Sequence, residues 1–111
     1  MAKKIPVKPI RSSIKIKVIK KIHPSELYGN EPPIDGTITD VCPRLEVGQE
    51  FLVGEDGNMP EGFCTWAWND IYGALTHLMF GGDFPWVQEK GKLIACCTDG
   101  MRPVFFKLER I

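Results

Sequence analysis

Four cysteines are the side chains with the most chemistry to offer in this 111-residue chain. Cys42 precedes a proline, Cys64 opens a helical pattern, and Cys96 and Cys97 are adjacent in an apolar run. No Cys-x-x-Cys pair occurs, so the spacing typical of zinc-binding and thioredoxin-like motifs is missing. Adjacent strand residues point to opposite faces, so only one of the adjacent pair can share a site with Cys42 and Cys64.

These thiols allow three interpretations. In the first, a zinc or iron ion is held by Cys42, Cys64 and one cysteine of the adjacent pair, for which we choose Cys97. Zinc–sulfur bonds are about 2.3 Å long. His23, His77, an aspartate or water would complete that site. In the second, one thiol is reactive in redox or enzymatic chemistry. In the third and plainest, the cysteines are small buried hydrophobes, as free cysteines often are.

Cys64 is the best candidate for an activated thiol. It lies in the first turn of the predicted helix, where unpaired N–H groups and the helix dipole favour an anion. Burial against Phe63 and Trp68 would oppose that effect. A disulfide between Cys96 and Cys97 is disfavoured, because adjacent Cα atoms are about 3.8 Å apart and disulfides usually need roughly 4.4–6.8 Å.

Polar and aromatic side chains near the cysteines predict a small pocket. Trp66, Asp70 and His77 share one face of the helix, and Asp99 and Arg102 flank the last turn. If that turn comes near the helix start, Arg102 could bind an anionic ligand as a bidentate donor. Each of these residues also has a plainer interpretation: Asp99 forms the turn, Arg102 makes a surface ion pair, and the tryptophans pack in the core. The candidate pocket or thiol site consists of Cys64, Trp66, Cys96, Cys97, Asp99 and Arg102.

The helix that would position Cys64 spans residues 63–79. Apolar residues recur there at spacings of three and four, which is typical of a helix packed on a core. Gly81 and Gly82 follow, and glycine commonly ends a helix. This is the one long amphipathic segment in the chain.

Four apolar runs predict strands, at residues 14–22, 47–53, 93–97 and 103–110. Residues 14–22 alternate with lysine, which indicates a half-buried strand near an edge, and residues 93–97 are apolar on both faces, which indicates a central strand. Residues 25–40 are expected to be irregular, with one short helical turn. We therefore predict an α+β fold, an antiparallel or mixed sheet of about four strands with one main helix on it. A small, partly open barrel plus a helix is the alternative.

This arrangement predicts where the cysteines meet. A helix that lies over residues 93–97, with its start toward the end of that strand, brings Cys64 close to Cys96 or Cys97. Alternation then leaves the other thiol of the pair on the opposite face. Asp99 or Arg102 would lie at the rim.

Charge is unevenly distributed, although the formal net charge is zero. Residues 1–21 hold eight of the fourteen Lys and Arg residues, and the first acidic residue is Glu26. A basic arm for nucleic acid is one interpretation, but no aromatic interleaving or nucleic-acid motif accompanies the charge, so a solvated strand face plus an extension is favoured. We assign residues 1–13 to a basic extension and residues 14–111 to a single domain.

No segment reads as a signal peptide or a membrane span, because charge or proline interrupts every apolar stretch near the start. The expected location is the cytoplasm, where thiols are normally kept reduced. The expected partners are a small ligand or another protein, with no membrane and no nucleic acid.

Three motifs follow one another in the chain: PEGFCxWAW at 60–68, FGGxFPW at 80–86 and CCTDGxRPV at 96–104. Together they resemble a family of small conserved hypothetical proteins of bacteria and archaea, many of them anaerobes. The resemblance spans residues 14–111. It implies a prokaryotic, cytosolic setting, and it implies no activity, cofactor or catalytic residue.

We expect a ligand- or protein-binding accessory domain without turnover, since no acid–base pair or nucleophile elbow is visible. One alternative is a thiol-dependent redox protein or enzyme that uses Cys64 or Cys97. The other is a metal-binding domain that uses Cys42, Cys64 and one of the adjacent pair. Whether the chain is an enzyme stays open at this point.

Overall fold

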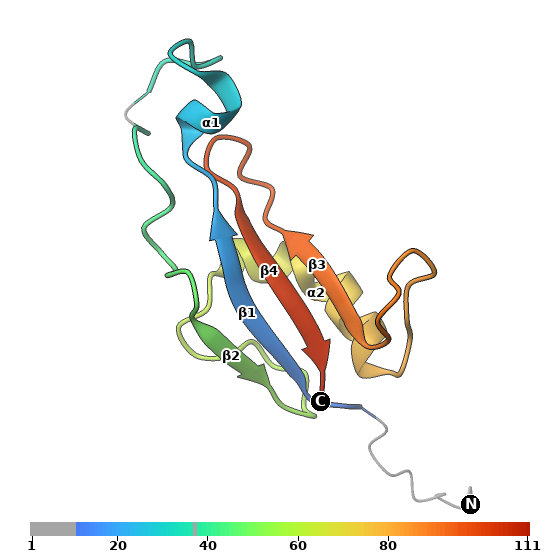
Figure 1. The fold of residues 1–111 in the computed structure, drawn as a ribbon. Helices are drawn as coiled ribbons and strands as arrows, with labels where there is room; N and C mark the ends of the chain where they lie inside the picture. Colours follow the sequence, from blue (N-terminus) through green and yellow to red (C-terminus); the bar gives the residue numbers. More distant parts are fainter. Residues whose placement is uncertain (1–10, 37) are drawn as a thin grey trace, which may run out of the picture.

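The structure is a computed structural model that describes residues 11–36 and 38–111. Its sheet contains β1 (Ile14–Lys21), β2 (Glu50–Val53), β3 (Lys92–Cys96) and β4 (Val104–Arg110), in the order β2-β1-β4-β3. Every neighbouring pair is antiparallel, and the sheet is open (Figure 1). The predicted α+β fold is confirmed, and so is the pairing of the last two strands; the barrel alternative is wrong.

Two predicted strand positions are wrong. β1 was expected near an edge, yet it lies between β2 and β4, and β3 was expected in the centre, yet it is an edge strand. The lysines of β1 mark the face of the sheet that points to solvent, and that pattern does not depend on whether the strand is at an edge. β3 is apolar on both faces because Leu93 packs against the core while Ile94 points to the open face, where it is 55% exposed.

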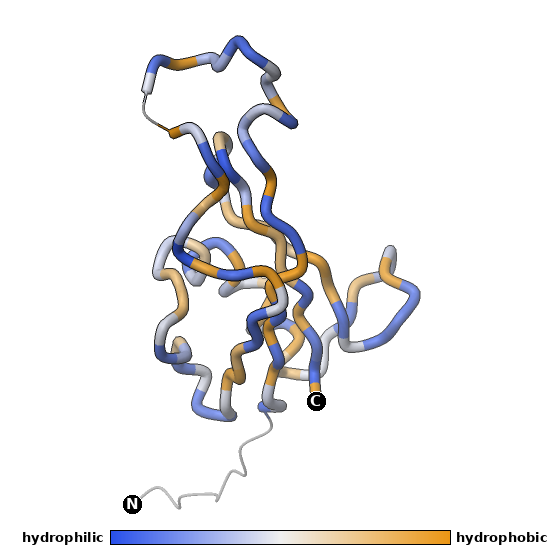
Figure 2. Tube along the Cα trace, turned by 60° about the vertical axis from the view of Figure 1, so that its left-hand side comes forward, coloured by the Kyte–Doolittle hydropathy of each residue, from blue (hydrophilic) through white to orange (hydrophobic). Residues whose placement is uncertain are grey.

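One main helix, α2 (Thr65–Met79), covers one face of the sheet (Figure 1). Hydrophobic and hydrophilic residues alternate along β1 and β4, as Figure 2 shows, so that these strands give their apolar side chains to this face. The core formed between the two layers contains Ile14, Ile16, Val18, Leu45, Phe51, Val53, Phe63, Ala67, Ile71, Leu75, Leu78, Met79, Val104, Phe106 and Leu108.

The limits of α2 follow from its terminal residues. Cys64 is the N-cap, with extended backbone angles, so the helix begins two residues later than predicted. Phe63, just before the cap, is buried and lies edge-on to Phe51, with ring centroids 5.0 Å apart. Phe80 is the C-cap, and Gly81 follows with a φ of +89°, a conformation that favours glycine.

The remaining elements are short. The helix α1 (Pro24–Tyr28) provides the one helical turn expected in the loop-rich region, and its N-cap His23 accepts a hydrogen bond from the Ser25 amide. β2 is shorter than predicted, because residues 47–49 form a turn before it. No helix among the described residues is long and apolar enough to cross a membrane.

Most of the basic extension, residues 1–10, lies outside the described residues, but residues 11–13 are anchored. The Ser12 amide donates to the Met79 carbonyl at 2.7 Å, and the Ile111 amide donates to the Ser13 carbonyl at 3.0 Å. Arg11 donates to the Asp56 carbonyl at 3.0 Å. Residues 11–13 are therefore held by contacts with Asp56, Met79 and Ile111.

Candidate functional site

A pocket of about 240 Å³ opens where α2 begins and where the β3–β4 loop (residues 97–103) leaves the sheet. Five of the six residues predicted for the site line this pocket: Cys64, Trp66, Cys97, Asp99 and Arg102. Cys42, predicted only as a metal ligand, lines it too. Residues that are far apart in the chain thus meet in one place, and Arg44 joins them there.

Cys96 is the predicted site residue that lies elsewhere. It pairs in register with Phe105 on the open face of the sheet, and its Sγ donates to the Cys97 carbonyl at 3.0 Å. Partial desolvation raises the pKa of the Cys96 thiol, with smaller contributions from Cys97 and Asp70. Since the thiolate is the nucleophile, Cys96 is a poor candidate for thiol chemistry at neutral pH.

The β3–β4 pairing holds Cys97 in place beyond the end of β3. Its amide donates to the Val104 carbonyl at 3.0 Å, and the Val104 amide donates to the Cys97 Sγ at 3.3 Å. Across the pocket, the Cys64 carbonyl accepts from the Trp68 amide at 2.9 Å, while its side chain makes no capping hydrogen bond. The alternation of the strand therefore turns Cys97, and not Cys96, toward the start of α2.

A three-residue clasp fastens the β3–β4 loop to the helix. Trp66 Nε1 donates to Thr98 Oγ1 at 2.6 Å, and the Thr98 amide donates to Asp70 Oδ2 at 2.7 Å. The Thr98 hydroxyl also bonds to both carboxylate oxygens of Asp70, at 3.0 and 3.1 Å. Sequence reasoning placed Trp66 and Asp70 on one helix face but missed Thr98. The sequence offers only one hint that Thr98 belongs to the site, its position next to Cys97.

Asp99 and Arg102 shape the loop at the rim. Asp99 Oδ1 accepts from the amides of Met101 and Arg102 at 3.0 and 3.3 Å, and Oδ2 accepts from Arg102 Nε at 3.2 Å. Both plainer interpretations therefore hold: Asp99 forms the turn, and it makes an ion pair with Arg102. The terminal amino groups of Arg102 have no hydrogen-bond partner among residues 11–36 and 38–111, so they are free to bind a ligand.

The third wall comes from residues 42–45. Lys21 Nζ donates to the carbonyls of Cys42 and Leu45 at 2.9 and 2.7 Å, which holds this segment against the end of β1. Leu45 is buried in the core, whereas Arg44 is exposed and lines the pocket. Sequence reasoning missed Arg44, because the backbone contacts that hold its segment leave no residue pattern there.

The metal interpretation finds no matching ligand set. Within the part of the chain that the structure describes, no group of three or more His, Cys, Asp or Glu side chains is arranged to hold a metal ion. His23 caps α1, and His77 lies at the far end of α2, where its Nε2 is 2.9 Å from the Asp83 carbonyl. All four cysteines are free thiols.

No protein-family model, no curated protein and no solved structure matches this chain. The resemblance drawn from the three motifs thus stays a prediction. Two of these motifs, at 60–68 and 96–104, meet at the pocket, and the third, at 80–86, lies beyond the other end of α2.

Proposed function

We propose that this chain is an accessory domain that binds a small anionic molecule in the pocket at the start of α2, without turnover. The observation that carries the proposal is that two arginines, Arg44 and Arg102, line one small pocket. Asp99, the one carboxylate among its described lining residues, is already engaged. Guanidinium groups bind carboxylates and phosphates in bidentate geometry. The first backbone N–H groups of α2 add partial positive charge.

Pocket size and lining limit the ligand. A volume of about 240 Å³ holds roughly eight water-sized groups, at about 30 Å³ for each water of the liquid. Val104 and Phe106 give the pocket an apolar floor, and the arginines are at its polar side. A short carboxylate or phosphate ester with a small apolar part matches both features.

The groups around the pocket favour binding without turnover. No histidine is among its described lining residues, and Asp99 holds its own loop in place. General acid–base catalysis needs a titratable group that is free to reach the ligand. The proposed location is the cytosol, where the pocket thiols would stay reduced.

Nuclear magnetic resonance tests this proposal. Uniformly ¹⁵N-labelled protein is titrated with inorganic phosphate, acetate and succinate, with sodium chloride as the control for ionic strength. We expect at least one anion to shift the amide signals of Trp66, Ala67 and residues 97–102, and the Trp66 indole signal, with saturation. Shifts spread evenly over surface lysines, or no saturable shifts at all, would reject the pocket as an anion site.

A second candidate function, thiol–disulfide exchange, is favoured by one observation: Cys42, Cys64 and Cys97 line the same pocket. In such a reaction, a thiolate attacks a low-molecular-weight disulfide and releases one thiolate. A second pocket cysteine then displaces the other half, so that a protein disulfide forms and two small thiols leave. Mass spectrometry after treatment with a glutathione-type disulfide would show the loss of two hydrogens in the wild type and in Cys96→Ser, but not in Cys64→Ser, if Cys64 takes part.

A further inference from the structure

The face of the sheet opposite α2 carries an excess of positive charge. Register and burial place on this face the strand residues that alternate with the core residues. Its charged members are five lysines and two glutamates: Lys15, Lys17, Lys20, Lys92, Lys107, Glu50 and Glu109. The lysines of β1 belong to the basic run at the start of the sequence. The sheet gathers their positive charge on one face, and none of these lysines lines the small-anion pocket.

This charge is incompletely neutralised within the described residues. Glu109 is the shared partner of three lysines, at 4.0 Å from Lys15, 3.8 Å from Lys92 and 3.9 Å from Lys107. Lys15 also pairs with Glu50, and Lys92 with Glu89, so the salt bridges of the described residues leave Lys17 and Lys20 without a carboxylate partner. Lys17 lies directly opposite Lys107 in the β1–β4 pair, with Glu50 opposite it in the β1–β2 pair. Like charges directly opposite one another in a sheet are unfavourable. An anionic partner on this face would remove that repulsion.

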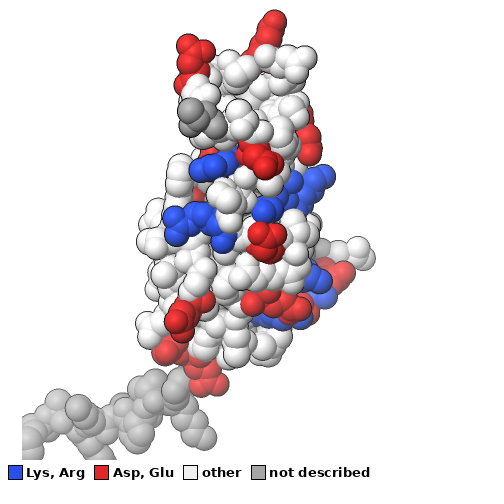
Figure 3. All heavy atoms as spheres, turned by 90° about the vertical axis from the view of Figure 1, so that its left-hand side faces the viewer, with Lys and Arg blue, Asp and Glu red and all other residues white. Residues whose placement is uncertain are grey.

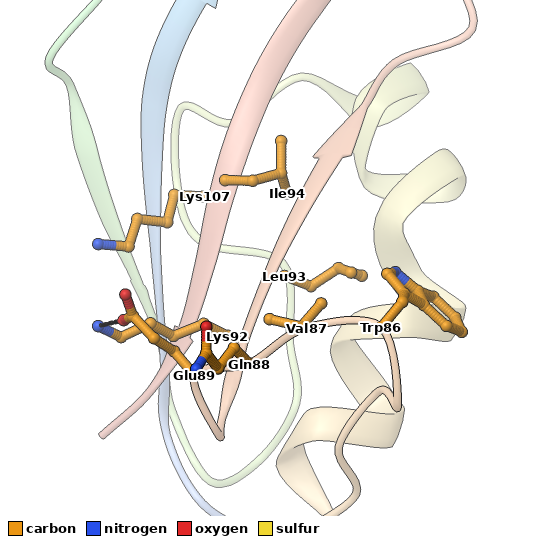
Figure 4. A pocket seen from close by; sticks show the side chains of 8 residues that line it. All are labelled: Trp86, Val87, Gln88, Glu89, Lys92, Leu93, Ile94 and Lys107. Carbon is orange, nitrogen blue, oxygen red and sulfur yellow. Dashed lines mark hydrogen bonds and ion pairs between the residues drawn. The ribbon is translucent and has the colours of Figure 1, made fainter.

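A pocket of about 480 Å³ adjoins the charged face, beside β3, and both apolar side chains and charged ones, Glu89 among them, line it. In Figure 4, Val87 and Leu93 lie close together in its middle, with Trp86 on one side and Lys107 on the other. Trp86 is 75% exposed, the highest value among the exposed large hydrophobic residues, and Ile94 is 55% exposed. Neighbouring apolar side chains that stay exposed beside polar ones are typical of an interaction surface.

β3 also presents a free strand edge. It pairs with β4 on one side, and no described strand pairs with its other side. An unpaired edge offers backbone N–H and C=O groups to an extended segment of another chain. Alternate side chains of such a segment would point to the same face of the sheet as Lys92 and Lys107.

We propose that β3, the open face and the pocket beside Trp86 form a docking site for an extended, acidic segment of a partner protein. The segment pairs with the free edge of β3. Its carboxylates lie beside Lys92 and Lys107, and one of its apolar side chains enters the pocket at Val87 and Leu93. This interface is separate from the small-anion pocket and does not depend on it.

The observations favour an acidic protein segment over single-stranded nucleic acid. Nucleic-acid platforms stack bases on exposed aromatic rings of the binding face. Phe105 is the one aromatic residue that the described strands place on the open face, and it is half-buried; Trp86, in the loop before β3, adds one exposed ring beside that face. Glu50 and Glu109 also lie among the lysines of the open face, so its strands carry no continuous basic track. Acidic and basic side chains are likewise intermixed on the side drawn in Figure 3, which is the left-hand side of Figure 1.

Fluorescence anisotropy with three labelled probes tests the proposal at about 150 mM salt, where weak charge effects are screened. The probes are a ten-residue peptide of alternating leucine and aspartate, its leucine–lysine counterpart, and a single-stranded DNA decamer. We expect saturable binding of the acidic peptide alone. Absence of binding, or tighter binding of the DNA, would overturn the proposal.

A matched pair of variants locates the site. Ile94→Glu and Leu52→Glu make the same substitution on the same face, at positions 55% and 60% exposed, but on opposite edges of the sheet. We expect Ile94→Glu and Lys107→Glu to weaken binding of the acidic peptide about tenfold or more, and Leu52→Glu to change it less than threefold. Equal weakening by Ile94→Glu and Leu52→Glu would mean that the peptide senses only the charge of the face, and would overturn docking at β3. Circular dichroism of each variant confirms that it is folded.

Discussion

Trp66 and Thr98 lie 32 residues apart in the chain and are joined by a 2.6 Å hydrogen bond from the indole Nε1 to the threonine hydroxyl. Because Thr98 is also bonded to Asp70, the first two turns of α2 and the β3–β4 loop are fixed to one another. That connection holds Cys97 and Arg102 opposite the start of the helix. The pocket therefore depends on polar contacts at its rim as well as on the core below it.

Replacing Asp70 with alanine should loosen this clasp. The substitution removes the acceptor of the Thr98 amide and hydroxyl, and hydrogen bonds to a charged group contribute about 1.5–3 kcal/mol when well shielded. Since the site is partly exposed, we expect the free energy of unfolding to fall by about 1–2 kcal/mol. Chemical denaturation measures the change. Asn69→Ala, at an exposed neighbouring position, is the control, and an equal loss in both variants would contradict the role of the clasp.

The start of the chain provides a second prediction, in two parts. Deleting residues 1–10 should change the free energy of unfolding by no more than about 0.5 kcal/mol. Deleting residues 1–13 should cost about 1–3 kcal/mol, because it also removes the backbone bonds of Ser12 and Ser13 and the contacts of Arg11 with the Asp56 carbonyl and the Phe80 ring. Equal stability of the two truncated proteins would show that these contacts contribute nothing.

Asp83 should make stability depend on pH. The Gly91 amide, at 2.6 Å, and Arg110, at 3.1 Å, hold the pKa of this carboxyl below its usual value. A depressed pKa in the folded state stabilises the fold above the pKa of the unfolded chain, and the contribution is lost as the pH falls through the folded value. The stability difference between wild type and Asp83→Asn should therefore be largest near neutral pH and shrink in acid. A difference that is constant from neutral to acidic pH would contradict this linkage.

Cys96 should react slowly with alkylating reagents at neutral pH, because partial desolvation raises the pKa of its thiol. We expect its modification rate, followed by peptide mapping, to rise continuously from about pH 7 to about pH 9, without a plateau. Cys96→Ser should leave the reactivity of Cys42 and Cys64 unchanged, because Cys96 lies on the opposite face of the sheet. Rapid alkylation of Cys96 near neutral pH would show that the thiol is activated.

Local pattern predicted much of this fold. The spacing of apolar residues from Ala67 to Met79 identified α2, and the alternation around Cys97 predicted that only one thiol of the adjacent pair would face the helix. Strand order was not predictable in the same way, because Ile94 is apolar and exposed, which made an edge strand resemble a central one. The lysines of β1 likewise indicate which face of the sheet is exposed to solvent. They do not indicate whether β1 lies at an edge of the sheet.

The walls of the pocket were harder to predict than its floor. Arg44 reaches the site because Lys21 binds two backbone carbonyls, and a contact to backbone leaves no pattern in the sequence of the segment it holds. Thr98 was missed for a similar reason: its role depends on Asp70, which is close only after the helix and the loop have packed together. Long-range polar contacts of this kind have no periodicity to detect.

Removal of one charge from the pocket tests the proposed function most directly. Arg44→Gln is the most informative variant, because Arg44 is exposed and its loss leaves the Asp99–Arg102 pair intact. With the anion that shifts the pocket signals most, calorimetric titration should show about tenfold weaker binding for Arg44→Gln, equivalent to about 1.4 kcal/mol. Lys90→Gln, which removes one charge from an exposed loop outside the pocket, should change the affinity less than twofold. If Lys90→Gln weakens binding as much as Arg44→Gln, or if the wild type binds none of the anions, the pocket is not an anion site.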